Sequence, residues 1–374
     1  MAVPPASPAA RGRSEAGLSA IDVDLHHQIV DWSEVAPHVP AGLRWRVSAK
    51  SGPPLARHGF QKVGAGTGNV PMPAADSGTI SHPAGDPRWV KEHYLDRRGV
   101  NLAILTGSLF SLGVQPGPDL ASAIARGVND WTLENWVRPF RCFKGSILIA
   151  QQDPIAAVAE IDRLGSDSGM VQVLLGSAAE SPLGRRAYHP IYEACVRHGL
   201  PLALHLGGEG AGMSPPSTPV GHPSTYFEWY GSLPQSYMGH ITSMVTEGVF
   251  EKFPKLKVIL YEGGVFWLPH LIWRFDKNWK AQRSETPWVT RPPSSYVLDH
   301  FYSTTYPLEA PPNPRYLGEI LDIIHGERTL LFAGNYPNWE LGDPFDMIRD
   351  VPDDLRQGIL VDNALSVYGK RLLA

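Results

Sequence analysis

The chain has 374 residues, a formal net charge of −4 and 43% apolar residues, a length that suits one large barrel or two average domains. The near-neutral charge balance argues against a nucleic-acid partner, and no apolar run approaches the ~20 residues that span a bilayer. The only two cysteines, Cys142 and Cys195, lie far apart, which argues against a disulfide framework and fits a reducing cytoplasm.

The first 19 residues lack the apolar core of a signal peptide, and we expect them to form a disordered leader. Residues 20–374 are expected to form a single domain. Within it, eight short apolar runs recur in chain order and predict strands over residues 20–27, 99–107, 142–150, 169–176, 201–208, 256–264, 300–308 and 329–337. Most are nearly continuous in Val, Ile and Leu, as parallel strands buried on both faces should be.

Helical spacing of apolar residues marks the segments between these runs, most clearly at 118–139 and 153–165. Another predicted helix, 188–199, ends at a glycine just before the next strand. Strands that alternate with helices eight times predict an α/β fold, a (β/α)₈ barrel of TIM type. The alternative is an open doubly wound sheet, which is less favoured because no GxGxxG follows the first strand.

Two segments, about 46–97 and 207–235, are too long to be simple connections. We expect both to lie over the carboxyl-terminal mouth of the barrel, where active sites of this architecture form.

Polar side chains stand at the carboxyl ends of four predicted strands. They are Asp24 and His26 on the first, His205 on the fifth, Glu262 on the sixth and Asn335 on the eighth. Ordinary hydrogen bonding would explain any one of these side chains alone. In a barrel, however, the carboxyl ends of the strands converge, so the five side chains are expected to lie close together. Nitrogen and oxygen donors without thiolates predict a site for Zn, Fe or Mn.

The chain resembles the family-2 amidohydrolases, metal-dependent TIM-barrel hydrolases and decarboxylases, over residues 21–368. The most specific matches are "GVFEKFPKLKVILYEGGVFWLPHLIWRFDKNWK" and "LLFAGNYPNW". The resemblance implies that the family's first-strand HxH motif falls on Asp24 and His26, and its fifth-strand metal histidine on His205. The sixth-strand histidine of the decarboxylases falls on Glu262, and the eighth-strand aspartate on Asn335.

The departures from the family pattern bear on the chemistry. An amide at Asn335 cannot accept a proton as the family's aspartate does, although its carbonyl oxygen can still bind a metal. Glu262 and Asp24 replace imidazoles by carboxylates, and this mixed donor set is used by iron in oxygen-activating enzymes.

A narrower resemblance is to the non-heme diiron monooxygenases of platensimycin and platencin diterpenoid pathways. It implies two irons per chain, dioxygen, an external electron donor and a bulky alicyclic, terpenoid-like substrate to be hydroxylated. Two alternatives stay open. One is a hydrolase or non-oxidative decarboxylase of a small carboxylic acid with one Zn or Mn and Glu262 as base. The other is a non-catalytic binding protein.

His240, in the helical segment before the sixth strand, is a candidate further metal ligand and catalytic residue. His27 alternates with His26 and is predicted to face the helix layer instead. Family resemblance is compatible with a homodimer. Aromatic residues in the long fifth-strand loop and after the eighth strand predict an apolar substrate pocket lined by Tyr226, Phe227, Trp229 and Trp339.

Overall fold

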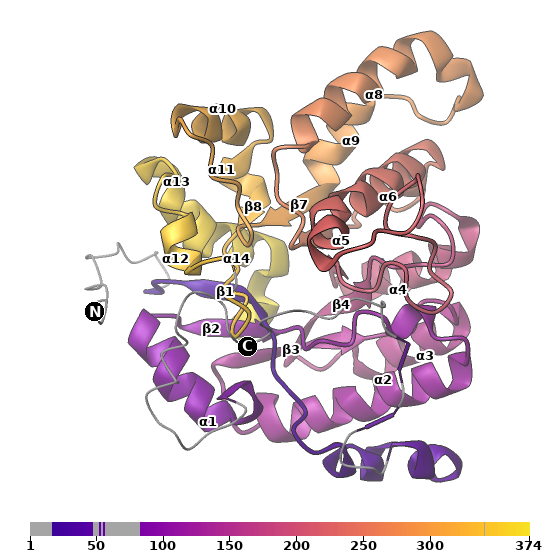
Figure 1. The fold of residues 1–374 in the computed structure, drawn as a ribbon, viewed down its shortest axis with the longest axis vertical. Helices are drawn as coiled ribbons and strands as arrows, with labels where there is room; N and C mark the ends of the chain where they lie inside the picture. Colours follow the sequence, from indigo (N-terminus) through magenta and orange to yellow (C-terminus); the bar gives the residue numbers. More distant parts are fainter. Residues whose placement is uncertain (1–16, 48–51, 54, 57–82, 340) are drawn as a thin grey trace.

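Eight parallel strands form the centre of the computed structural model, which describes residues 17–47, 52, 53, 55, 56, 83–339 and 341–374 (Figure 1). Each strand pairs with the next in chain order, and a parallel bridge between Leu25 and Tyr336 joins the last strand region to the first. The strands are β1 Ile21–Leu25, β2 Leu102–Leu105, β3 Phe143–Leu148, β4 Met170–Gly176, β5 Leu202–His205, β6 Val258–Tyr261, β7 Phe301–Thr304 and β8 Leu330–Leu331. The predicted (β/α)₈ barrel is confirmed, and the alternative of an open doubly wound sheet is wrong.

Helices surround the barrel, and the three predicted from spacing are present as α2 (Pro118–Thr132), α3 (Pro154–Leu164) and α4 (His189–His198). The last of these ends at Gly199 in the left-handed conformation (φ 63°), as the sequence pattern predicts. The longer helices are α2 Pro118–Thr132, α3 Pro154–Leu164, α4 His189–His198, α6 Pro234–Thr246, α8 Leu268–Gln282, α9 Pro293–His300 and α10 Arg315–Ile323. The shorter ones are α1 Pro87–Val90, α5 Tyr226–Ser232, α7 Val249–Lys252, α11 Gly326–Thr329, α12 Pro344–Met347, α13 Asp353–Gln357 and α14 Asn363–Tyr368.

Polar contacts fill one level of the barrel interior below the carboxyl-terminal mouth. The side-chain amide of Gln172 on β4 donates to Ser146 Oγ at 2.8 Å and accepts from the hydroxyls of Tyr261 and Tyr368, each at 2.9 Å. Nearer the strand starts, Lys144 Nζ donates to the backbone oxygen of Ala374 at 3.2 Å. Ala374 therefore contacts the barrel at the start of β3.

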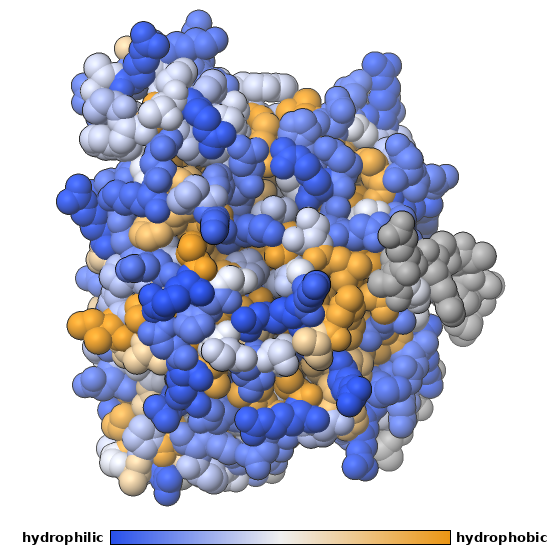
Figure 2. Space-filling view, turned by 180° about the vertical axis from the view of Figure 1, so that it is seen from behind, coloured by the Kyte–Doolittle hydropathy of each residue, from blue (hydrophilic) through white to orange (hydrophobic). Residues whose placement is uncertain are grey.

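Of the two predicted insertions, the second is described throughout and contains α5. Most of the first, and residues 1–16 of the predicted leader, lie outside the described residues. In the space-filling view, polar side chains cover much of the surface, with apolar ones gathered toward the middle of the face (Figure 2). Among the helices of the described segments, none combines the length and apolarity needed to cross a bilayer.

Candidate metal centre

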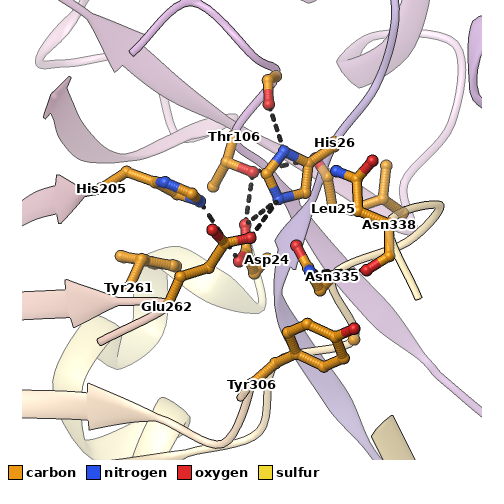
Figure 3. A network of polar contacts seen from close by, with 12 residues as sticks. Asp24, Leu25, His26, Thr106, His205, Tyr261, Glu262, Tyr306, Asn335 and Asn338 are labelled. Atoms are coloured by element: carbon orange, nitrogen blue, oxygen red, sulfur yellow. Dashed lines mark hydrogen bonds and ion pairs between the residues drawn. The ribbon is translucent and has the colours of Figure 1, made fainter. Parts of the chain in front are cut away.

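Four side chains that can bind a metal meet at the carboxyl ends of β1, β5 and β6. They belong to Asp24, His26, His205 and Glu262, and one ligand atom of each lies within 4.8 Å of the others. His26 Nε2 is 3.4 Å from Asp24 Oδ1 and 3.7 Å from Glu262 Oε1, while His205 Nε2 is 3.6 Å from Asp24 Oδ2. In Figure 3 these side chains point toward one another.

Irregular backbone carries several of these groups. The β1–β2 register shifts between Asp22 and Leu25, and the Asp24 N–H donates to Asp22 Oδ1 at 2.8 Å. Just after their strands, Glu262 (φ 61°) and Asn335 (φ 48°) adopt left-handed backbone conformations. This conformation costs a residue with a side chain roughly 1–2 kcal/mol, least for asparagine. The cost at Glu262 is consistent with a functional demand on its direction.

Backbone carbonyls orient both imidazoles. His26 Nδ1–H donates to the oxygen of Gly107, and His205 Nδ1–H donates to the oxygen of Leu206, each at 2.7 Å. Each ring therefore directs its Nε2 toward the cluster, as histidines that bind metals do when their other nitrogen donates a hydrogen bond.

Four buried polar atoms at the centre have no hydrogen-bond partner among the described residues. A buried polar atom left in this state costs about 1–3 kcal/mol, and one divalent ion would satisfy all of them at once. The residues thus fit a metal, and the centre is a divalent metal site. The unpartnered atoms are Asp24 Oδ2, His26 Nε2, His205 Nε2 and Asn335 Oδ1.

Charge coupling within the cluster is strong. Burial by itself would raise the pKa of Asp24, but His26 and His205 hold that pKa below its usual range. Burial would lower the pKa of His26, but Asp24 and Glu262 raise it to about 9. Without an ion, the histidine proton balances the carboxylates. A metal must displace that proton, so metal binding releases protons.

Asn335 lies beside the four metal ligands, fully buried after β8. Its Nδ2 donates to the backbone oxygen of Asn338 at 2.9 Å, and this bond turns Oδ1 away without a partner. The amide orientation supports a neutral oxygen donor and leaves no titratable group at this position.

The structure does not bring His240 into the cluster. Its Nε2–H donates to the oxygen of Ser177 at 2.7 Å, and its Nδ1 accepts from the N–H of Leu183 at 3.2 Å. Burial lowers the pKa of His240 to about 4, so the ring is neutral. Both nitrogens are occupied in holding the loop after β4, which leaves no lone pair for a metal. The expectation that His240 is a ligand is therefore not met by the geometry.

The four aromatic residues expected in the pocket lie in different environments. Phe227 is 89% exposed, whereas Trp229 is buried and donates through Nε1 to the oxygen of Glu209. Tyr226 packs on Trp229 at a centroid distance of 5.5 Å. Trp339 is buried and donates to the oxygen of Gly334. Trp229 and Trp339 thus have packing roles, and Phe227 points to solvent.

Two residues beside the metal ligands were not singled out from the sequence. Thr106, at the end of β2, donates through Oγ1 to Asp24 Oδ1 at 2.6 Å, and its strand-end position was the signal available. Phe110 stacks on the ring of His205 with a centroid distance of 3.6 Å. It fits there because Gly176 lacks a side chain: a Cβ at that residue would lie 1.8 Å from the oxygen of Phe110. Nothing in the sequence pattern indicated this contact.

Asp22 is a buried carboxyl one level below the centre. It accepts from the N–H groups of Asp24 and Gly334 at 2.8 and 2.6 Å, and from the hydroxyl of Tyr94 at 2.8 Å. Burial raises the pKa of Asp22 to about 7, although these three hydrogen bonds oppose the rise. Its hydrogen bond with Gly334 therefore connects β1 to the segment after β8. The raised pKa means that this carboxyl binds its proton more tightly than in the unfolded chain.

We expect Asp22→Asn to change how stability depends on pH. A carboxyl whose pKa is raised by folding stabilises the protein fully below its unfolded pKa, near 4, and loses that contribution as the pH rises toward 7. The amide has no such loss, so the melting temperature of the metal-free variant should exceed that of the unmodified protein at pH 8 but not at pH 4. Thermal unfolding with a chelator present measures this. The exposed Asp350→Asn is the control, and parallel pH curves for Asp22→Asn and unmodified protein would contradict the assignment.

Comparison with known proteins relates this chain to a family. The family model described as "Amidohydrolase" matches residues 23–370. One similar curated protein is a gamma-resorcylate decarboxylase from Polaromonas sp. strain JS666, 27% identical over 229 residues, which are 56% of this chain and 66% of that protein. Another is a 2-amino-3-carboxymuconate-6-semialdehyde decarboxylase from Dictyostelium discoideum, 24% identical over 75% of this chain and 76% of its own length.

Solved structures share the fold. A dihydroxybenzoic acid decarboxylase from Polaromonas sp. JS666, with bound manganese and the inhibitor 2-nitroresorcinol, superposes with a TM-score of 0.65 at 20% identity. The match covers 94% of this chain and 97% of that one.

Proposed function

The chain belongs to the amidohydrolase family, and from this premise we propose that it is a metal-dependent lyase that removes CO₂ from a carboxylic acid without oxidation. The observation that carries the proposal is the set of unpartnered, buried nitrogen and oxygen atoms at the carboxyl-terminal mouth of the barrel. The named relatives with this family's sequence pattern are decarboxylases, which supports a lyase over the oxidoreductase predicted from the sequence.

In this proposal Asp24, His26 and His205 would hold a divalent ion, and Asn335 Oδ1 would be available as a further, neutral donor. When bound, a divalent ion would supply positive charge that favours binding of an anionic substrate oxygen. The bond between the substrate carbon and its carboxyl carbon breaks, the electron pair stays on the substrate, and a proton replaces CO₂.

The proton must come from a group that can carry one. Asn335 cannot, because an amide does not titrate in the physiological range. Glu262 is the most exposed member of the cluster, its side chain being 13% accessible, so it can exchange a proton with solvent. We assign it the role of proton carrier, in keeping with the functional demand indicated by its left-handed backbone.

Glu262→Gln tests this role. The amide keeps an oxygen near the ion but carries no exchangeable acid, so CO₂ release should fall by about 10²–10⁴-fold at saturating Mn²⁺. The measurement is ¹⁴CO₂ release from carboxyl-labelled aromatic acids, including 2,6-dihydroxybenzoate. The control is Glu309→Gln. In the unmodified protein the carboxylate of Glu309 accepts from the N–H of Val265 at 2.9 Å, three residues after Glu262. Equal losses in both variants would contradict a specific role for Glu262.

A second candidate is the oxygenase predicted from the sequence, favoured by one observation: the eighth-strand position holds the neutral Asn335. Two carboxylates and two imidazoles also suit iron. In this reaction, dioxygen and two electrons from an external donor hydroxylate a bulky alicyclic, terpenoid-like substrate, with two protons forming water from the second oxygen atom. About two irons per chain after anaerobic purification, with substrate-dependent oxygen uptake, would favour it. One Mn or Zn with CO₂ release favours the lyase, and a protein with neither activity would act only in binding.

A further inference from the structure

The segment 106–110, directly after β2, contacts three of the four side chains of the metal centre. None of its five residues is an Asp, Glu, His or Cys, so it supplies no ligand of the kinds that form the cluster. Each contact is of a different kind: a side-chain hydroxyl, a backbone carbonyl and an aromatic ring. The pairs are Thr106 with Asp24, Gly107 with His26, and Phe110 with His205.

The first contact decides which oxygen of Asp24 is available to an ion. A carboxylate has two equivalent oxygens, and rotation about its Cβ–Cγ bond exchanges them. The Thr106 hydroxyl donates to Oδ1 at 2.6 Å (Figure 3), whereas Oδ2 has no hydrogen-bond partner among the described residues. The backbone N–H of Thr106 donates to the oxygen of Leu25 at 2.9 Å, so this residue is itself held against β1. The carboxyl is thereby fixed with Oδ2 available.

The other two contacts fix the imidazole rings. Gly107 adopts the left-handed conformation (φ 66°), and its oxygen accepts from His26 Nδ1 at 2.7 Å. Phe110 lies flat on His205, with the ring centroids 3.6 Å apart and the planes at 2°. Tyr261 also stacks on His205, at a centroid distance of 5.6 Å. Rotation of the His205 ring would break these contacts, so the ring plane is set by the fold.

The surroundings of the segment hold it in place. Just beyond its end, Gln152 Nε2 donates to the oxygen of Leu112 at 2.9 Å. The backbone oxygen of Phe110 packs against Gly176, where an added Cβ would lie 1.8 Å away. Residues that hold the geometry of a site act most precisely when packing and hydrogen bonds fix them in turn.

We propose that the segment 106–110 orders the metal ligands before an ion arrives and thereby sets the affinity for the ion, with Thr106 and Phe110 as positioning residues. Ligands that are already ordered in the folded protein lose less conformational entropy when an ion binds, so the ion binds more tightly. The inference goes beyond the proposed function, because it rests on the metal centre and holds for any reaction at that centre.

Thr106→Val and Thr106→Ser separate the hydroxyl from the shape of the side chain. Val has nearly the same shape without the donor, so Mn²⁺ affinity should fall by about 10–100-fold, the loss typical of a residue that orients a ligand. Ser keeps the donor, so its affinity should stay within about threefold of the unmodified protein. Thr132→Val is the control, because it removes a buried hydroxyl bonded to His27, which is outside the cluster. Electron paramagnetic resonance of free Mn²⁺, during titration of the metal-free protein, measures the affinities.

Phe110→Leu is the second arm and acts on another ligand. Loss of the stacked ring should weaken Mn²⁺ binding by about threefold to tenfold, which corresponds to the worth of an aromatic pair. The matched control is Phe143→Leu, at a buried position at the start of β3. This control should lower the melting temperature without changing the Mn²⁺ affinity.

Unchanged affinity in Thr106→Val or in Phe110→Leu would overturn the proposal. A loss in Thr106→Ser as large as that in Thr106→Val, or equal losses in the controls, would do the same. If the affinities change as expected but the unmodified protein releases no CO₂, the proposed function fails and the positioning role stands. CO₂ release with unchanged affinities in the variants has the opposite meaning.

Discussion

His205→Ala is expected to remove most of the bound metal and all detectable activity. The ring supplies one of the ligand atoms of the cluster. Its Nε2 lies 3.6 Å from Asp24 Oδ2 and has no hydrogen-bond partner among the described residues. Loss of residues that merely orient a ligand costs 10–100-fold in metal affinity, so loss of the ligand itself should cost at least about 100-fold. Metal content after dialysis, measured by mass spectrometry, gives the result.

The ring of His205 is also packed between Phe110 and Tyr261, so the alanine variant should lose some stability. His205→Gln keeps more of the volume and separates the two effects. The matched control is His240→Ala, which removes another buried histidine whose nitrogens both bond to backbone. We expect it to lower the melting temperature while keeping the metal. Full metal occupancy in both His205 variants would place the site elsewhere.

Asn335→Asp is expected to tighten metal binding by about tenfold or more. A carboxylate here adds a negative charge in a buried site beside Asp24 and Glu262, so the metal-free protein should become less stable and the metal-loaded one gain more from the ion. The same change removes the Nδ2 donor to the oxygen of Asn338, which adds to the loss in the metal-free state. The shift in melting temperature on adding Mn²⁺ should therefore grow.

The effect of Asn335→Asp on the reaction should differ between the two candidate functions, the lyase and the oxygenase. In a lyase, the new carboxyl is a second proton carrier, so CO₂ release should stay equal or increase. In an oxygenase, the added charge makes the metal harder to reduce, so oxygen uptake should fall. Asn338→Asp, three residues away, is the control for charge alone. An unchanged Mn²⁺-induced melting shift in Asn335→Asp would show that this residue does not face the ion.

Much of the fold was accessible from the sequence because parallel strands buried on both faces leave a strong signal. The run "GMVQVLLG" is short and apolar at nearly every position, which is typical of such a strand, and β4 Met170–Gly176 occupies it almost fully. The cluster was accessible for a related reason: His205 and Glu262 stand where their strands end, and barrel geometry brings such positions together. Asp24 and His26 also followed from their spacing of two.

The errors have physical causes. A helical position alone does not tell whether a ring nitrogen finds a backbone carbonyl, and for His240 two backbone groups decided its role. In the long loop, residues 226–232 form the helix α5. Residues two apart on a helix point to nearly opposite sides, so Trp229 is buried while Phe227 faces solvent. Neither the role of His240 nor the difference in burial between Trp229 and Phe227 can be predicted from the amino-acid composition of these segments.

The missing side chain at Gly176 also limits how this protein can evolve. A Cβ there would lie 1.8 Å from a backbone atom of Phe110, and one at Gly208 would lie 2.8 Å from the Cβ of Ala178 and 3.0 Å from the Cα of Ser111. In a saturation mutagenesis screen, these two glycines should tolerate replacement as poorly as the metal ligands do, although neither offers a ligand atom. Suppressor mutations that rescue Gly176 variants should fall in the segment 108–114, because a shift of that segment makes room for the added Cβ. The position of Phe110 over His205 therefore depends on these two glycines, and we expect these residues to change together during evolution.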